Sequence, residues 1–416
     1  MYIVGEEEID ALARVVRSDA LFRYGVGQEC SRFEARYAAY LGVKHAALAA
    51  SGTNALVAAV VGVGLGPGDE VLIPAHTYMA TATSVLAAGA IPVFVNIDES
   101  LTMDPEAFER AIGPKTRAVI PVHMWGTACD MRPIMAIAGK HGLIVIEDAC
   151  QGVGGSYEGR KLGSIGDVGC YSFNYYKNMT AGEGGGVSTN SDYFAERMRC
   201  AIDPCNFYWQ GRNESVKPFA GNGARASELM GAMLNVQLDR IDGMVAVMRE
   251  ERDAILAVVK SLARLGVRAA PLHSPADDCA THAILTFPTA GAAAAFSKVF
   301  PSVVAGRTGR HTYTEWDQVL TGDGAAHPEM NPFRMAANKD CRKTYTREMC
   351  ADSLAILART VLVPTHPRHT EADIANICRN IDIAGRVAMG DLSACEAELG
   401  NVEPIEARRF DLKEDA

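Results

Sequence analysis

Short apolar runs alternate with helical stretches through the first half of the chain. Two amphipathic helices are predicted first, at residues 6–19 and 32–40, from apolar residues at helical spacing. Short apolar runs bounded by Gly, Pro or Asp then predict strands, with helices between them. The strands are expected at 46–49, 71–73, 92–95, 118–122 and 143–147, and the helices at 53–63, 78–88, 105–112 and 131–140. This alternation indicates βαβ units and a mainly parallel sheet that is buried on both faces.

The second half of the chain has a different pattern. A long helix is predicted within residues 225–262, followed by strands at 283–287 and 360–363 and a last helix at about 370–387. A polar stretch with Gly and Pro, residues 305–333, separates the two strands and is predicted to be a loop. We therefore expect a large α/β/α sandwich domain at 1–235, a smaller α+β domain at 236–390, and a charge-rich peripheral tail at 391–416.

Composition excludes several classes of function. The 416 residues carry a net charge of −10 and no basic stripe, so a nucleic-acid partner is not expected. No apolar run reaches membrane-spanning length, and the first residues do not resemble a signal peptide. The eleven cysteines are scattered, without a CxxC pair, which predicts free thiols in the cytoplasm and no metal site.

The stretch 143–189 carries the most chemistry. Glu147 and Asp148 end a predicted strand, where ligands of open α/β sheets bind, although they could simply cap the next helix. Lys177 follows in a Gly-rich segment with Ser172 and several aromatic residues nearby. A lone loop lysine is normally a solvated surface residue, but glycines at this density allow the backbone to approach a ligand closely.

A phosphate site and a ring wall are predicted earlier in the chain. The stretch AASGTNAL (49–56) follows a strand and opens a helix, so Gly52 and Thr53 would present unpaired N–H groups to an anion. Tyr78 lies just past another strand and could stack on a planar ring, or belong to the core. A lysine amine, a strand-end acid, a phosphate site and a stacking aromatic together meet the needs of pyridoxal phosphate.

These stretches resemble the DegT/StrS-type sugar aminotransferases over most of the chain. The resemblance rests on EDACQ, on SF with a lysine four residues later, on GEGG, and on VLVPTHPRHTEADI near the end. It implies the fold type I architecture of aminotransferases that use pyridoxal phosphate. Within this family, the motif around Lys177 is most similar to that of enzymes that aminate an octulosonic acid at C8.

The resemblance also implies roles for individual residues. Lys177 would bond to the cofactor and move protons, and Asp148 would pair with the ring nitrogen. Gln151 would contact the ring hydroxyl. The phosphate would be held by Gly52, Thr53 and Ser172, and Tyr78 would stack on the ring. The family is built from homodimers with shared sites, in which an Asn reaches the partner's phosphate. Here Gly223 occupies that position, and Asn222 lies one residue earlier.

The implied reaction moves an amino group from glutamate or glutamine to a ketone on a nucleotide-linked sugar, an octulosonate or a cyclitol. Substrate-facing residues are expected in the 305–333 segment, at Arg307, Arg310, His311 and Tyr313, since two arginines with aromatics suit a carboxylate, a phosphate or a sugar face. A solvated loop is an equal alternative. Segment 203–219 is a candidate lid or substrate wall.

Four other functions are weighed against this one. A dehydratase of the same family would carry His in place of Lys177, and a desulfurase would need a cysteine in a distinctive setting. A non-catalytic binding protein would not need Lys177, Asp148 and Gln151 together. A dinucleotide-binding dehydrogenase is suggested only by GVGLGPGDE (62–70), which follows a helix where a strand is required.

Overall fold

A seven-stranded sheet forms the centre of the large domain. The computed structural model describes residues 2–211 and 216–391. The strands lie in the order β1-β9-β8-β5-β4-β2-β3, and only β9 runs antiparallel to its neighbours. Their bounds are β1 (His45–Ala49), β2 (Glu70–Pro74), β3 (Ile91–Val95), β4 (Thr116–Val119), β5 (Ile144–Asp148), β8 (Val168–Ser172) and β9 (Gly185–Thr189). The predicted mainly parallel sheet is confirmed.

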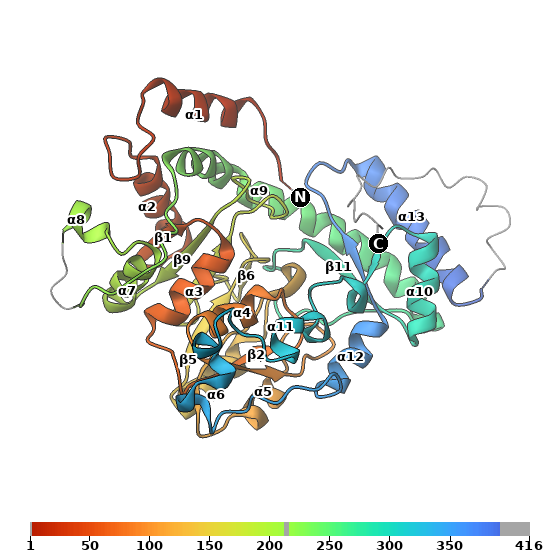
Figure 1. The fold of residues 1–416 in the computed structure, drawn as a ribbon. Coiled ribbons are helices and arrows are strands. Elements are labelled where there is room, and N and C mark those ends of the chain that lie inside the picture. Colours follow the sequence, from red (N-terminus) through yellow and green to blue (C-terminus); the bar gives the residue numbers. More distant parts are fainter. Residues whose placement is uncertain (1, 212–215, 392–416) are drawn as a thin grey trace.

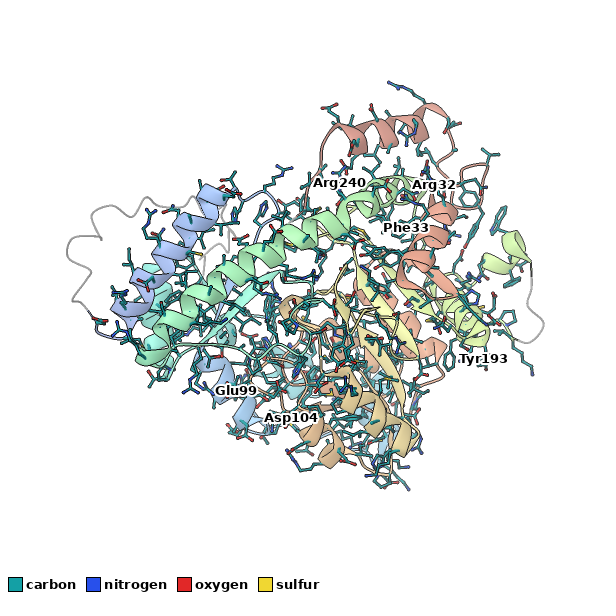
Figure 2. All side chains as sticks on the ribbon, turned by 180° about the vertical axis from the view of Figure 1, so that it is seen from behind. Arg32, Phe33, Glu99, Asp104, Tyr193 and Arg240 are labelled. Carbon is teal, nitrogen blue, oxygen red and sulfur yellow. The ribbon has the colours of Figure 1, made fainter. Side chains whose placement is uncertain are left out.

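Helices cover both faces of this sheet (Figure 1). The core on one face includes residues of α2, α5, α6 and α9, and the core on the other includes residues of α3, α4 and α7. Figure 2 shows the face with α2 and α9, where it labels Phe33 and Arg240. The bounds are α1 (Glu6–Arg17), α2 (Glu29–Leu41), α3 (Gly52–Gly62), α4 (Ala80–Ala87), α5 (Pro105–Ala111), α6 (Met131–His141), α7 (Asp192–Ile202), α8 (Asn206–Gln210) and α9 (Glu228–Ser261).

The small domain is built around the C-terminal half of α9. Its antiparallel sheet has the order β10-β11-β13-β12, and its own core packs α9 against α10 and α13. The bounds are β10 (Arg268–Ala269), β11 (His282–Thr286), α10 (Ala290–Val299), β12 (Val303–Val304), α12 (Ala351–Ala358), β13 (Thr360–Pro364) and α13 (Glu371–Ala388). A short hairpin, β6 (Ser156–Tyr157) with β7 (Arg160–Lys161), completes the strands described. The expected smaller α+β domain is therefore present.

The division of the chain differs from the expected 235 boundary in two ways. Residue 235 lies inside α9, which is continuous from one domain to the other. The long connection between β12 and α12 also leaves the small sheet and packs on the large domain, where Trp316 and α11 (Asp317–Leu320) join the core that contains residues of α3 and α4. The small domain is thus not one uninterrupted stretch of chain. The expected tail at 391–416 lies, apart from residue 391, outside the described residues.

Candidate active site

Two neighbouring acids end β5, and the structure gives them different tasks. Asp148 lies at the carboxyl end of the strand with 4% of its surface exposed. Its carboxylate accepts hydrogen bonds from Thr81 Oγ1 at 2.9 Å and from the Cys150 N–H at 3.2 Å. Thr81 comes from the first turn of α4, so two elements fix the orientation of this acid.

Glu147 is fully buried, and its carboxylate bonds to backbone and side-chain groups of the same chain. Its two oxygens accept backbone N–H groups of Gly163, Ile165 and Gly166 at 2.9, 2.5 and 2.6 Å. His123 Nε2 lies 3.0 Å from the same carboxylate, and His123 Nδ1 accepts the Cys129 N–H, so Nε2 carries the proton that it donates to Glu147. Glu147 therefore holds the 163–166 turn, and Asp148 is the acid available to a ligand.

Lys177 lies in a turn between the antiparallel strands β8 and β9. The turn is closed by the Phe173 N–H, which donates to the Gly184 carbonyl at 2.8 Å. The next residue, Asn178, is buried and donates to the Val153 carbonyl at 2.6 Å. A Cβ on Gly185 would lie 2.2 Å from the Ser51 carbonyl oxygen, so this close approach to the start of α3 requires glycine.

The surroundings of Lys177 favour a neutral amine. Burial lowers the pKa of Lys177 below its usual value, and the charge of Arg310 lowers it further, while Cys150 and Asp148 act in the opposite direction. Desolvation disfavours the charged form of an amine, and a neutral amine is the nucleophilic and basic form. The amine is therefore suited to attack a carbonyl and to move protons.

An anion cradle lies next to this turn. The helix α3 begins at Gly52, and the Ser51 hydroxyl caps it by accepting the Asn54 N–H at 3.1 Å. A Cβ on Gly52 would lie 2.7 Å from Ser172 Cβ and 3.3 Å from Cys150 Sγ. Thr53, in the first turn, is exposed. The Ser172 hydroxyl and the N-terminus of α3 thus converge, which is the arrangement that binds phosphate.

Aromatic rings form a second group near Lys177. Tyr78 follows β2 and is 42% exposed, with its ring centroid 5.8 Å from that of His311. The Trp125 ring lies 4.7 Å from the His311 ring, and Trp125 Nε1 donates to His76 Nε2 at 2.8 Å. Gln151 Oε1 accepts the Trp125 N–H at 3.1 Å. Burial lowers the pKa of His76 to about 3 and that of His311 to about 2, so both imidazoles are neutral at physiological pH.

The four residues predicted to face the substrate have different surroundings. Arg310 is half-buried, and its guanidinium lies 5.6 Å from the Tyr176 ring centroid. His311 is 8% exposed and belongs to the aromatic group, whereas Arg307 is exposed on a 3₁₀ turn. Tyr313 has no exposed surface. Its ring packs against Phe94, and its hydroxyl bonds to the backbone of residues 347 and 350. Tyr313 is therefore a core residue, and its predicted substrate contact is wrong.

Asn222 is exposed, close to the chain that leads into α3. Its N–H donates to the Ala201 carbonyl at 3.0 Å, and two residues later the Ala224 carbonyl accepts the Ala50 N–H at 2.8 Å. Gly223, with φ of 65°, turns the chain between them. Among the residues that the structure describes, no hydrogen bond joins the Asn222 side chain to the cradle of its own chain, so its phosphate role stays a prediction.

Some residues of the site were missed in the sequence. Thr81 lies three residues after Tyr78, which is one helical turn, and this spacing could have indicated that both flank one ligand. Trp125 has a left-handed backbone with φ of 55°, which is unusual for a bulky residue and which sequence patterns do not reveal. Cys150 and His76 are typical of core positions, so nothing in the sequence distinguishes them.

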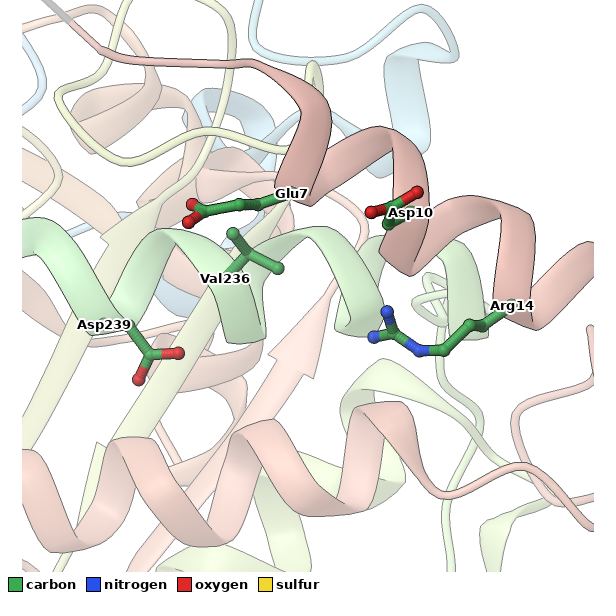
Figure 3. A pocket seen from close by; sticks show the side chains of 5 residues that line it. All are labelled: Glu7, Asp10, Arg14, Val236 and Asp239. Carbon is green, nitrogen blue, oxygen red and sulfur yellow. The ribbon is translucent and has the colours of Figure 1, made fainter.

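Other features of the described residues lie apart from this group. A pocket between α1 and α9 is lined by Glu7, Asp10, Arg14, Val236 and Asp239 (Figure 3). Within residues 2–211 and 216–391, no helix has the length and apolar character to cross a membrane, and no three His, Cys, Asp or Glu side chains are grouped to hold a metal ion. The ten cysteines of this part of the chain are free thiols.

Comparisons with known proteins agree with the geometry. Residues 3–299 match the model of the DegT/DnrJ/EryC1/StrS aminotransferase family. GDP-perosamine synthase of Caulobacter vibrioides is 40% identical over 261 residues, 61% of this chain and 67% of that protein. L-glutamine:2-deoxy-scyllo-inosose aminotransferase of Streptoalloteichus tenebrarius is 38% identical over 275 residues, 62% of this chain and 63% of that protein. The aminotransferase structure from Psychrobacter cryohalolentis superposes with a TM-score of 0.77 at 25% identity, covering 91% and 96% of the two chains.

Proposed function

The chain belongs to the DegT/DnrJ/EryC1/StrS aminotransferase family, and from this premise we propose that it transfers an amino group from glutamate or glutamine to the ketone of a sugar or cyclitol. The fold type I architecture and the family both indicate pyridoxal phosphate as the cofactor. The aligned part of the chain spans about two thirds of the relatives named above. The activity of the whole protein is therefore inferred here from its site.

The observation that carries the proposal is the convergence of three elements on Lys177. Asp148 at the end of β5, Ser172 at the end of β8 and Gly52 at the start of α3 are brought together with the turn that bears the lysine. When bound, pyridoxal phosphate supplies an electron sink for bonds broken at the amino-bearing carbon. The residues present meet its demands for an amine, an anion beside the ring nitrogen and a phosphate cradle.

Each side chain then has a proposed task. Gly52, Thr53 and Ser172 hold the phosphate, because the N-terminus of α3 and a hydroxyl favour an anion. Asp148, oriented by Thr81 and the Cys150 N–H, keeps the ring nitrogen protonated. Gln151 would contact the ring hydroxyl, and Tyr78 would stack on the ring.

Lys177 moves the proton. Its lowered pKa gives a larger neutral fraction near neutrality than a solvated lysine has, so the amine can take a proton from the substrate carbon and return it. The half-buried Trp125 ring and the buried His311 ring form an aromatic wall that limits the access of water to this part of the site. Exclusion of water protects reactive intermediates from hydrolysis.

The donor and acceptor follow from the family at a coarser level. One relative is named for L-glutamine and 2-deoxy-scyllo-inosose and another for GDP-perosamine, which supports an amino-acid donor and a ketone on a sugar or ring polyol as acceptor. We propose glutamate or glutamine as the donor. The acceptor classes proposed are a nucleotide-linked keto-sugar, a keto-octulosonate and a keto-cyclitol.

A homodimer with shared sites is also proposed. Exposed aromatic residues support it, since Tyr24 stacks on Trp209 and Phe22 packs edge-on against both, with Phe22 46% and Trp209 56% exposed. Apolar patches of this kind suit an interface better than solvent. The segment 203–219, predicted as a lid or wall, contains α8 of this group, whereas its Arg212 lies outside the described residues. The exposure of Asn222, beside the chain that enters α3, supports a proposed contact with a second subunit.

An absorption spectrum of the purified protein with pyridoxal phosphate tests the function. We expect a visible band that moves to the near ultraviolet on addition of glutamate or glutamine, and that returns when a keto acceptor is added. A band that persists with both donors and with other amino acids would contradict amino transfer and favour a dehydratase. No band at all after reconstitution would leave a non-catalytic binding protein.

A further inference from the structure

Arg310 leaves the backbone at a firmly held point. Trp316 Nε1 donates to the Arg310 carbonyl at 3.3 Å, and the Gly309 N–H donates to Glu315 at 2.9 Å. On the other side, the Thr77 N–H donates to the His311 carbonyl at 2.9 Å, which ties the segment to the end of β2. The guanidinium therefore reaches into the site from a fixed base, although it belongs to the connection between β12 and α12.

The guanidinium rests on the ring of Tyr176, with Cζ 5.6 Å from the centroid. Tyr176 is the residue before Lys177, so the cation stands beside the lysine turn. Burial is the main cause of the lowered pKa values of Lys177 and His311, and the charge of Arg310 contributes to both. A cation over an aromatic face is held in position without being neutralised.

No anion in the described part of the chain neutralises Arg310. Arg310 is half-buried, yet it takes part in none of the ion pairs of the described residues. Arg310 is thus a permanent positive charge beside the Lys177 turn without an anionic partner in the described part of the chain. An unpaired, partly desolvated cation is costly, and an incoming anion removes that cost.

The phosphate has its own cradle, and Asp148 has its own donors. The cradle is formed by Gly52 and Ser172. The Asp148 carboxylate is already bonded to Thr81 and Cys150. The anion that suits Arg310 is therefore one that arrives with a substrate.

We propose that Arg310, supported by Tyr176, is the carboxylate receptor of the site. The inference rests on the proposed function, because every amino-acid donor carries a carboxylate on the carbon that bears the amine to be transferred. A planar guanidinium binds a carboxylate through two parallel hydrogen bonds. An acidic acceptor such as a keto-octulosonate offers the same group, so the chemistry is shared between two sources.

Binding of an unreactive carboxylate tests the receptor without any turnover. Glutarate is titrated by calorimetry into the protein loaded with pyridoxal phosphate. Arg310→Gln should weaken glutarate binding at least about tenfold, since charge-assisted hydrogen bonds are lost, and Arg310→Lys should restore part of it. Arg334→Gln is the matched control, because it removes the same charge from an exposed position of the same connection and should leave binding unchanged.

The support from Tyr176 is tested in the same assay. Tyr176→Phe keeps the aromatic face and should bind glutarate as the unchanged protein does. Tyr176→Ala removes the face and should weaken binding. Equal binding of glutarate by the unchanged protein and by a folded, cofactor-loaded Arg310→Gln variant would overturn the proposal.

The source of the carboxylate is identified by the two half-reactions. If Arg310→Gln raises the dissociation constant for glutamate and leaves the KM for a neutral keto-sugar unchanged, Arg310 binds the donor. If the substitution raises only the KM for an acidic keto acceptor, Arg310 binds the acceptor. If no amino acid changes the spectrum of the unchanged protein, the proposed function fails, whereas the glutarate titration still decides whether Arg310 is a carboxylate receptor.

Discussion

The two sides of Lys177 are built in different ways. On the cofactor side, functional groups lie at the ends of regular elements, at Asp148 after β5, Ser172 after β8 and Gly52 at the start of α3. On the substrate side, Arg310 and His311 belong to a long connection of short helical turns between β12 and α12. The sheet fixes the first side, whereas contacts between distant segments fix the second.

This difference separates chemistry common to the family from recognition. The parallel sheet brings strand ends to one edge whatever the substrate, so the cofactor groups can be kept while the connection changes. The connection is nevertheless held tightly, because Trp316 and Tyr313 are anchored in the core against Phe94. Substitutions on the two sides should therefore have different signatures.

Removal of the Lys177 amine should have the largest effect. Lys177→Ala deletes both the covalent bond to the cofactor and the proton carrier, and general acid–base catalysis alone contributes roughly 10²–10⁴-fold. We expect amino transfer to fall by at least about 10³-fold, measured in single-turnover reactions with glutamate. Lys177→Arg is the control, because it restores the charge without a usable amine and should be as inactive. Activity in Lys177→Arg near that of the unchanged protein would show that charge alone is needed.

The neighbouring acids of β5 should separate activity from stability. Asp148→Asn should lower the rate by about 10²-fold and leave the unfolding free energy nearly unchanged. Glu147→Gln should lower the unfolding free energy by roughly 2–4 kcal/mol, because a buried carboxylate loses charge-assisted bonds to three N–H groups. Urea denaturation and rate measurements on both variants provide the check. Equal effects of the two substitutions on both quantities would contradict the assignment of Glu147 to structure.

Sequence patterns predicted the cofactor side far better than the substrate side. The β5 strand was expected at 143–147 and is found at Ile144–Asp148, so Asp148 appears at its end as predicted. Periodicity depends on local burial, and these strands are buried on both faces. Residues 305–333 were expected to form a loop, but Trp316 and Val319 are fully buried there. Trp316 packs against Phe94, more than two hundred residues away, and no local pattern records such a contact. The same contact accounts for the error at Tyr313.

Crowding of the phosphate cradle should have a smaller effect. Gly52→Ala adds a Cβ that would lie 2.7 Å from Ser172 Cβ. The end of β8 must therefore shift away from the start of α3. We expect cofactor affinity to fall about tenfold, which corresponds to roughly 1.4 kcal/mol, in a fluorescence titration with pyridoxal phosphate. Gly139→Ala is the control, since nothing lies within 4 Å of the added Cβ in α6 and the affinity should not change. An unaltered affinity of Gly52→Ala would argue that phosphate binds elsewhere.

Within the connection, Tyr313 and His311 should differ although they are two residues apart. Tyr313→Phe keeps the ring against Phe94 and removes only the hydroxyl, which accepts the Cys350 N–H at 3.2 Å and donates to the Arg347 carbonyl. We expect the unfolding free energy to fall by about 1 kcal/mol, with the KM for the keto acceptor unchanged. His311→Ala removes a ring of the wall beside Tyr78 and Trp125, so that KM should rise. A raised KM in Tyr313→Phe would show that the buried end of the connection also affects substrate binding. It would contradict the division of the connection into residues that anchor it in the core and residues that contact the substrate.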